Sequence, residues 1–253
     1  MPTPADLWET SLMELTHEQA HELAREKGSN PVAYFLVRLI LVPVLRIFFG
    51  LQAKGVENIP KTGPVVIAPN HKSFWDSFFL AAVVKRRLHF MGKAELFRGW
   101  RGRLFLALGA FPVLRGASDQ EALETSRAIL LRGDVLALFP EGTRVSDPER
   151  LGNPKRGATR LAIETGAVII PTAMTGTEKR KWPLPRKVRI VFGEPIPVTD
   201  LQASPEHAGM LLDQTLWPTV SEEYAKLRNT PGLIAGGLAA AGIGYALWRR
   251  RNR

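Results

Sequence analysis

The chain has 253 residues, a length that allows an ample core for one large α/β domain. It contains no cysteine, which excludes disulfides, thiol nucleophiles and cysteine-based zinc sites. Lysine and arginine total 34 against 24 aspartate and glutamate residues, and the formal net charge of +10 favours a polyanionic partner: an anionic membrane surface, a phosphorylated substrate or nucleic acid.

The N-terminal region is predicted to contain two helices. Residues 5–27 have apolar residues spaced for a partly apolar stripe, and this polar start lacks the pattern of a signal peptide. Residues 32–49 form an apolar run long enough for a transmembrane helix. Arg38 and Arg46 are spaced to share one polar side, with Pro43 between them, which favours an in-plane or re-entrant membrane helix. A helix buried in the protein core is the alternative, because periodicity cannot separate the two.

From residue 53 onward, short apolar runs alternate with helical segments, the pattern of an α/β fold. The predicted strands are Val65–Ala68, Leu88–Met91, Val135–Phe139, Ala167–Ala173 and Val188–Phe192. The predicted helices are Trp75–Val84, Trp100–Leu108, Asp119–Leu131, Lys155–Glu164 and Pro205–Leu227. We expect a single α/β domain over residues 51–228, with a mixed, largely parallel sheet flanked by helices. Membrane-associated helices in residues 1–50 and 229–253 would flank it.

The turn after the first of these strands carries a histidine and a carboxylate, at the kind of position where open α/β sheets build their sites. In one interpretation, Ser73 and Asp76 form a capping box and His71 is an ordinary loop histidine. In the other, His71 takes a proton from a substrate hydroxyl, while Asp76 fixes its tautomer and stabilises its charged form. The two are compatible, because a helix N-terminus favours a charged carboxylate.

A second turn, Pro140–Arg144, directly follows a predicted strand. Gly142 allows close backbone approach to a ligand, Thr143 offers a hydroxyl, and Arg144 has a guanidinium that matches phosphate or carboxylate. Taken alone, this segment is equally an ordinary turn with an ion pair.

Two further segments say little alone. Arg115 follows an apolar stretch that begins at Gly109, as a surface arginine would. Pro171 interrupts the apolar strand Ala167–Ala173, which indicates a strand that bends or lies at a sheet edge.

Together and in this order, the four segments resemble the glycerolipid acyltransferase family, most closely its bacterial 1-acylglycerol-3-phosphate acyltransferases. The resemblance covers about residues 50–200, and Lys93–Leu96 is similar to a Lys-x-Glu-Leu segment of that family. The matching residues are Asn70, His71 and Asp76 in the first block, Gly109, Phe111 and Arg115 in the second, Phe139 to Arg144 in the third, and Ile169, Ile170 and Pro171 in the fourth.

This resemblance implies acyl transfer from acyl-CoA or acyl-ACP to the hydroxyl of 1-acylglycerol 3-phosphate, giving phosphatidic acid, with no cofactor and no metal. His71 would be the general base and Asp76 its orienting partner, without a covalent acyl-enzyme, which agrees with the absence of a Gly-x-Ser-x-Gly elbow. Backbone amides near Lys93, or its ammonium group, would stabilise the tetrahedral intermediate. The arginines would hold the acceptor phosphate, and Glu141 would orient a basic group. The substrate-binding residues would then be Asn70, Lys93, Arg115, Glu141, Gly142, Thr143, Arg144 and Pro171.

Basic and apolar segments outside these blocks point to a membrane. The loops 85–87, 97–103 and 179–187 carry basic residues, two of them with tryptophan, which suits a lipid headgroup interface but equally a set of solvated loops. Residues 233–248 are almost wholly apolar and end in the arginine cluster of 249–253, which favours an interfacial or re-entrant helix. We expect a membrane-associated protein with its catalytic domain at the cytoplasmic face.

Three alternatives to the main hypothesis follow from the same residues. The first is an acyltransferase with another acceptor: glycerol 3-phosphate, another lysophospholipid or a glycolipid. The second is a non-catalytic protein that binds membranes or nucleic acid through its basic surface, although no nucleic-acid motif supports such a partner and none is expected. The third is a metal hydrolase. The sequence gives this alternative little support, because no cluster of histidine ligands lies beside His71 and Asp76.

Overall fold

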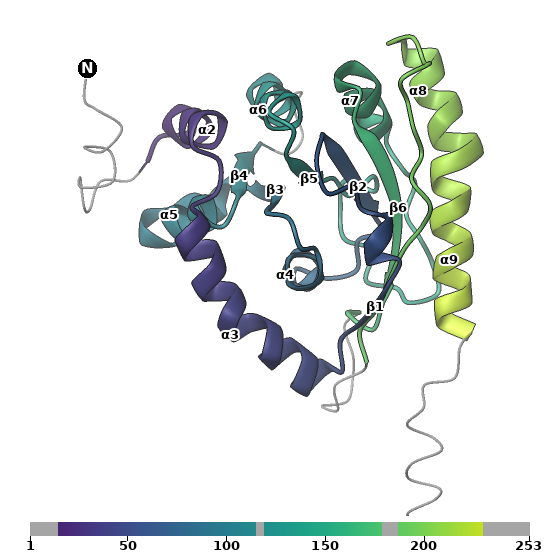
Figure 1. Cartoon of the computed structure of the whole chain (residues 1–253), viewed down its shortest axis with the longest axis horizontal. Coiled ribbons are helices and arrows are strands. Elements are labelled where there is room, and N and C mark those ends of the chain that lie inside the picture. The colour runs from purple at the N-terminus through teal and green to yellow at the C-terminus, as the bar shows by residue number, and fades with distance from the viewer. Residues whose placement is uncertain (1–14, 115–118, 179–186, 230–253) are drawn as a thin grey trace, which may run out of the picture.

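The computed structural model describes residues 15–114, 119–178 and 187–229. Their strands form a seven-stranded sheet of order β1-β7-β6-β2-β5-β3-β4 (Figure 1). Strands β2 to β6 are mutually parallel where they pair, β7 runs antiparallel to β6, and β1 is parallel to β7. The predicted mixed, largely parallel sheet is therefore confirmed. The strands are β1 (Gln52–Lys54), β2 (Val65–Pro69), β3 (Leu88–Lys93), β4 (Ala110–Val113), β5 (Val135–Ala137), β6 (Val168–Thr175) and β7 (Arg189–Phe192).

Helices cover both faces of the sheet. Helices α6 and α7 lie on one face, α4 lies on the other with α3 outside it, and α9 runs beside β6 (Figure 1). The α-helices are α2 (His17–Glu26), α3 (Pro31–Phe49), α4 (Asp76–Val83), α5 (Gly99–Ala107), α6 (Gln120–Leu131), α7 (Gly157–Thr165), α8 (Pro205–Leu211) and α9 (Trp217–Asn229). Two 3₁₀ turns, Val56–Asn58 and Ala94–Phe97, and a π-helical turn, Leu212–Leu216, complete the set among the described residues.

The central strand explains why its sequence is a continuous apolar run. All five residues of β2 are buried, because the strand lies between β6 and β5 and helices cover both faces of the sheet. A strand in this position has no solvent-facing side, so its residues do not alternate between apolar and polar. This strand positions the turn that carries His71.

Pro171 lies in an interior strand, so the expectation of an edge position is wrong. On β6, Thr172 pairs with Phe192 and Ile169 pairs with Ile196. Between these two pairs, the segment from Phe192 to Ile196 has one more residue than β6. The resulting bulge faces Pro171, whose carbonyl accepts a hydrogen bond of 2.8 Å from Gly193. A bulge accommodates the missing N–H of proline within a sheet.

The predicted strands and helices are present, with ends that move by at most two residues, apart from the first and last helices. The helix predicted over residues 5–27 is not continuous: α2 begins after the N-cap Thr16, whose side chain forms a capping box with Gln19. The last predicted helix, 205–227, contains a π-helical turn between α8 and α9. Strands β1 and β4 were not predicted, because the first has no apolar run and the second contains Pro112.

Helix α3 is apolar and exposed, so the alternative of a core helix is wrong. It is the one helix among the described residues that is long and apolar enough to cross a membrane, and 11% of its apolar window is buried. Arg38 is directed inward and donates hydrogen bonds to the carbonyls of Ala81 and Val84 at the end of α4. Arg38 therefore binds within the protein, whereas Arg46 is exposed. The tail helix expected over 233–248 lies outside the described residues.

Two of the three basic segments differ in structure from the expected loops. Arg86 donates to the carbonyls of Pro60 and Gly133, and Arg87 donates to that of Ser29, so these arginines join segments of the protein. Residues 97–103 are largely helical, because α5 begins at Gly99. Of the third loop, only Lys187 is described.

Candidate active site

A pocket of about 290 Å³ opens at the edge of the sheet where the parallel strands β2, β3 and β5 end. His71 follows β2, Lys93 is the last residue of β3, and Phe139 follows β5. All three line the pocket, and apolar side chains form most of the remaining wall. The sheet thus brings together residues from three of the predicted segments.

His71 and Asp76 form a hydrogen-bonded pair in this pocket. Nδ1 of His71 lies 2.9 Å from Oδ2 of Asp76, and the two residues are 8% and 0% exposed. The same carboxylate oxygen accepts hydrogen bonds from the backbone amides of Lys72, at 2.6 Å, and Ser73, at 2.8 Å. Because a carboxylate only accepts, Nδ1 carries the proton and Nε2 is left as the basic nitrogen.

The predicted capping box is only half formed, because the N-cap of α4 is Trp75 and not Ser73. Asp76 reaches back to the amide of Ser73, as in a capping box, while the Ser73 hydroxyl accepts from Trp75 at 3.3 Å. Helix α4 begins at Asp76, so the carboxylate lies at the helix N-terminus, where the helix dipole favours negative charge. The backbone amides of the turn therefore fix the carboxylate that pairs with His71.

The imidazole is also fixed from the side of β5. The ring of Phe139 stacks on that of His71, with centroids 3.9 Å apart and an angle of 23° between the planes. Sequence reasoning included Phe139 in a motif but gave it no role. Stacking against one face leaves the ring edge to carry the proton chemistry.

Glu141 supports His71 through the backbone. Its Oε1 accepts a hydrogen bond of 2.9 Å from the amide of His71, and its Oε2 accepts one of 2.8 Å from the amide of Gly152. The carboxylate is 3% exposed and does not line the pocket. Its carboxylate joins the His71 turn to the loop that follows β5, and its charge also acts on the buried ammonium group of Lys72. A contact of Glu141 with substrate stays a prediction.

Two other expected substrate-binding residues are structural. The side-chain amide of Asn70 exchanges two hydrogen bonds with the backbone of Met174, of 3.0 and 2.8 Å, and is fully buried. Pro171 is buried within β6. Neither residue lines the pocket, and Asn70 links the His71 turn to β6.

The remaining expected residues lie at the rim or beyond the described chain. Lys93 and Arg144 line the pocket, and the ammonium group of Lys93 pairs with Glu95 at 2.8 Å. Gly142 also lines it, in the left-handed conformation with φ of 64°. Thr143 is exposed on the same turn and does not line the pocket. Arg115 lies outside the described residues.

Sequence reasoning missed Lys72, the residue after the histidine. It is 1% exposed, and its ammonium group donates to the carbonyls of Asp147, at 2.8 Å, and Arg150. It also lies 4.8 Å from the ring centroid of Tyr224 in α9. Burial lowers the pKa of Lys72. This lysine links the loop after Arg144 to the turn that carries His71, and no local pattern in the sequence indicates that role.

Comparisons with known proteins agree with these features. The family model described as Acyltransferase matches residues 50–175. A 1-acyl-sn-glycerol-3-phosphate acyltransferase of Bacillus subtilis is 30% identical over 165 residues, which cover 64% of this chain and 81% of the relative. One of Pseudomonas aeruginosa is 28% identical over 187 residues, covering 70% and 69%. A chloroplastic relative from Arabidopsis thaliana is 31% identical over 153 residues, but these cover only 42% of its length.

A solved structure shares the fold. The crystal structure of the 1-acyl-sn-glycerophosphate acyltransferase PlsC from Thermotoga maritima superimposes with a TM-score of 0.64. The sequence identity is 24%, and the match covers 79% of this chain and 83% of the other.

Proposed function

The chain belongs to the acyltransferase family, and on this premise we propose that it transfers a fatty acyl group from an acyl thioester to the hydroxyl of 1-acylglycerol 3-phosphate. Phosphatidic acid and a free thiol are the products. The names of the bacterial relatives support the acceptor. The observation that carries the chemistry is the hydrogen bond of 2.9 Å between His71 and Asp76 at the wall of an apolar pocket.

In the proposed step, Nε2 of His71 accepts the proton of the acceptor hydroxyl while its oxygen attacks the thioester carbonyl carbon. The tetrahedral intermediate then collapses, its carbon–sulfur bond breaks, and the leaving thiolate takes the proton back from the imidazolium. Asp76 holds the tautomer and stabilises the imidazolium charge between these events. The atoms and charges balance without a cofactor, with acyl-CoA or acyl-ACP as the donor.

The rim of the pocket supplies groups for the charged parts of this reaction. Arg144 at the rim is a proposed partner of the acceptor phosphate, to which a guanidinium donates paired, charge-assisted hydrogen bonds. Arg115, which lies outside the described residues, is proposed as a second partner from its place in the sequence motif. The side chain of Lys155 lies beside Gly142, where a Cβ on that glycine would be 3.4 Å from its nitrogen, so it adds positive charge to the same turn. Lys93 and nearby backbone amides are the proposed donors to the oxyanion.

Exposed apolar side chains support a membrane location. Helix α3 presents Phe35, Leu39 and Ile47 to the outside, and Trp75 and Trp100 are also exposed. Large apolar groups exposed in one region mark an interaction surface, and tryptophan suits the lipid headgroup level. We propose that this surface holds the protein on an anionic membrane, at its cytoplasmic face, where a lysophospholipid acceptor is available.

A panel of acceptors tests the proposal. The full chain, reconstituted in lipid nanodiscs, is given labelled acyl-CoA or acyl-ACP with 1-acylglycerol 3-phosphate, glycerol 3-phosphate or lysophosphatidylcholine. We expect labelled phosphatidic acid and the highest kcat/KM for 1-acylglycerol 3-phosphate. A higher kcat/KM for another acceptor would change the substrate, and no transfer from either donor would refute the proposed activity.

A further inference from the structure

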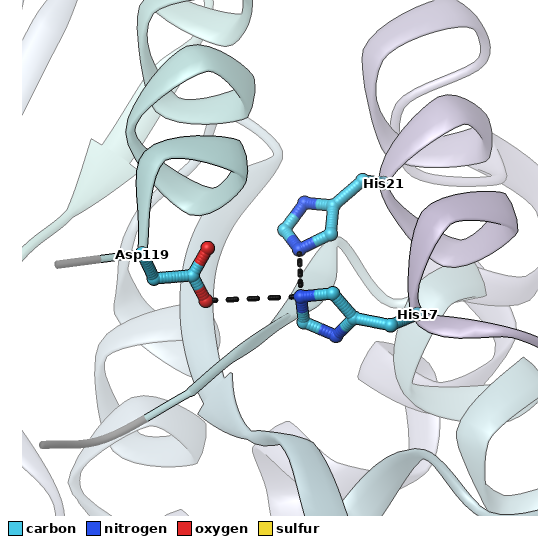
Figure 2. A group of neighbouring side chains, drawn as sticks. All are labelled: His17, His21 and Asp119. Carbon is cyan, nitrogen blue, oxygen red and sulfur yellow. Dashed lines mark hydrogen bonds and ion pairs between the residues drawn. The ribbon is translucent and has the colours of Figure 1, made fainter. Parts of the chain in front are cut away.

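A second group of titratable side chains lies between α2 and α6, at residues that the proposed reaction does not use. His17 and His21 stand one turn apart on α2, and Asp119 is the N-cap of α6 (Figure 2). The two Nε2 atoms are 3.2 Å apart, and Nε2 of His17 is 3.7 Å from Oδ2 of Asp119. One potential ligand atom from each residue lies within 4.8 Å of the others.

We propose that His17, His21 and Asp119 bind a zinc ion that fastens α2 to the start of α6. Zinc bonds of about 2.0 to 2.2 Å at tetrahedral angles place ligand atoms about 3.3 to 3.6 Å apart, close to the two separations found here. Residues 17–21 read His-Glu-Gln-Ala-His, a spacing with which two histidines on one helix face bind zinc. Two imidazoles and a carboxylate suit zinc better than calcium or magnesium.

The surroundings of the three side chains resemble those of a built metal site. Nδ1 of His21 lies 2.9 Å from the buried hydroxyl of Thr125, which orients the ring so that Nε2 faces His17. Oδ1 of Asp119 accepts a hydrogen bond from Ala122 and Oδ2 accepts one from Leu114. Partners of this kind fix the orientation of metal ligands.

Neighbouring charged side chains determine which group can take the fourth ligand position and what charge surrounds the ion. Oε2 of Glu121 lies 3.9 Å from Nε2 of His17, so this carboxylate or a water completes the tetrahedron. Arg25 brings an opposing positive charge, but it pairs with Glu121 at 3.5 Å. His21 is fully buried where α2 packs on α6, while the side chains of His17 and Glu121 are each 30% exposed. An ion held by residues of both helices would act as a structural link between them.

The site has a consequence for the residues beside it. The amide of Leu114 donates to Asp119 at 2.7 Å, and Leu114 directly precedes Arg115 in the sequence. An ion held by Asp119 would thus stabilise the contact between the residue after β4 and the start of α6. The inference does not depend on the proposed acyl transfer.

Metal titration of the full chain, purified without a histidine tag and treated with a chelator, tests the site. Calorimetry with zinc is expected to show one equivalent bound, and cobalt is expected to give the absorption bands of a tetrahedral complex. Zinc should also raise the melting temperature. His17→Ala and Asp119→Asn should each weaken binding about tenfold or more, while Asn still caps α6.

Two other histidines provide the controls. His207→Ala in α8 and His71→Ala in the pocket should bind zinc as the wild type does. The proposal is overturned if zinc does not bind, if several weak equivalents bind, or if His17→Ala and Asp119→Asn keep the wild-type affinity. The acyl-transfer rate of His17→Ala is measured in the same experiment. A failure of the zinc proposal can then be distinguished from a failure of the proposed function.

Discussion

Oε1 of Glu141 accepts a hydrogen bond of 2.9 Å from the backbone amide of His71, across 70 positions of sequence. Its Oε2 accepts a hydrogen bond from the amide of Gly152, so one buried carboxylate joins the turn that carries His71 to the loop after β5. Both donors are backbone N–H groups, so each of the two carboxylate oxygens has to act as an acceptor. The position of His71 therefore depends on a residue that does not line the pocket.

Glu141→Gln is expected to lower kcat with little change in the acceptor KM. The glutamine amide turns an NH₂ group toward one of the two N–H donors, and leaving a buried donor unsatisfied costs about 1 to 3 kcal/mol. Steady-state kinetics measure kcat and the acceptor KM separately. Glu194→Gln, at an exposed position, is the matched control. Wild-type kcat in Glu141→Gln would show that His71 does not need this support.

Lys72→Met should lower both the melting temperature and kcat. Methionine retains much of the length of the side chain but cannot donate to the carbonyls of Asp147 and Arg150. The loss of these charge-assisted hydrogen bonds should lower the free energy of unfolding by about 1 to 3 kcal/mol. Thermal unfolding in detergent measures the effect. Lys61→Met, at an exposed loop position, should unfold like the wild type. Equal melting temperatures for the two variants would contradict the role of Lys72.

Replacing Phe35 and Leu39 by aspartate is expected to weaken binding to anionic vesicles. The two side chains are 64% and 62% exposed on α3, so the change should spare the core and remove apolar area from the membrane-facing surface. Vesicle flotation measures the bound fraction. Leu131→Asp on α6 is the control, because this leucine is 67% exposed across the sheet from α3. Equal losses in both proteins would exclude α3 as the specific contact.

The free energy of unfolding should fall as the pH drops from about 6.5 to about 4. Burial lowers the pKa of His89 to about 4, below its ordinary value of 6.5, so in this window the unfolded chain binds a proton that the folded chain does not. The loss amounts to roughly 3 kcal/mol at full extent. Chemical unfolding of His89→Asn, whose amide can still donate to Val135, should show a smaller pH dependence. An unchanged slope would contradict the assignment.

Periodicity was enough to predict the strands that are buried on both faces and the helices that cover them. It could not predict β1, whose three residues gain their structure from pairing with β7. It also misplaced Arg38. A charged residue in an apolar helix suggests a polar, solvent-facing side of that helix. The carbonyls that Arg38 binds lie at the end of α4, more than forty positions away in the sequence, so no local pattern could indicate them.

The pairing of His71 with Asp76 could be predicted because the two residues are close in sequence and lie at a strand-to-helix turn. The roles of Glu141 and Asn70 could not, because both side chains bind backbone amides and carbonyls of distant segments. Sequence motifs show that these residues recur together. They do not show whether a polar side chain faces the substrate or supports the strands beneath it.

The central claim is that His71, oriented by Asp76, is the base that activates the acceptor hydroxyl. It is tested most directly by the acyl-transfer rate of His71→Ala and Asp76→Asn beside the wild type, with circular dichroism and vesicle binding as checks on folding. The account predicts no detectable turnover for His71→Ala and a loss on the order of 10³ to 10⁴-fold for Asp76→Asn. Near-wild-type turnover by a folded, membrane-bound His71→Ala protein would contradict it.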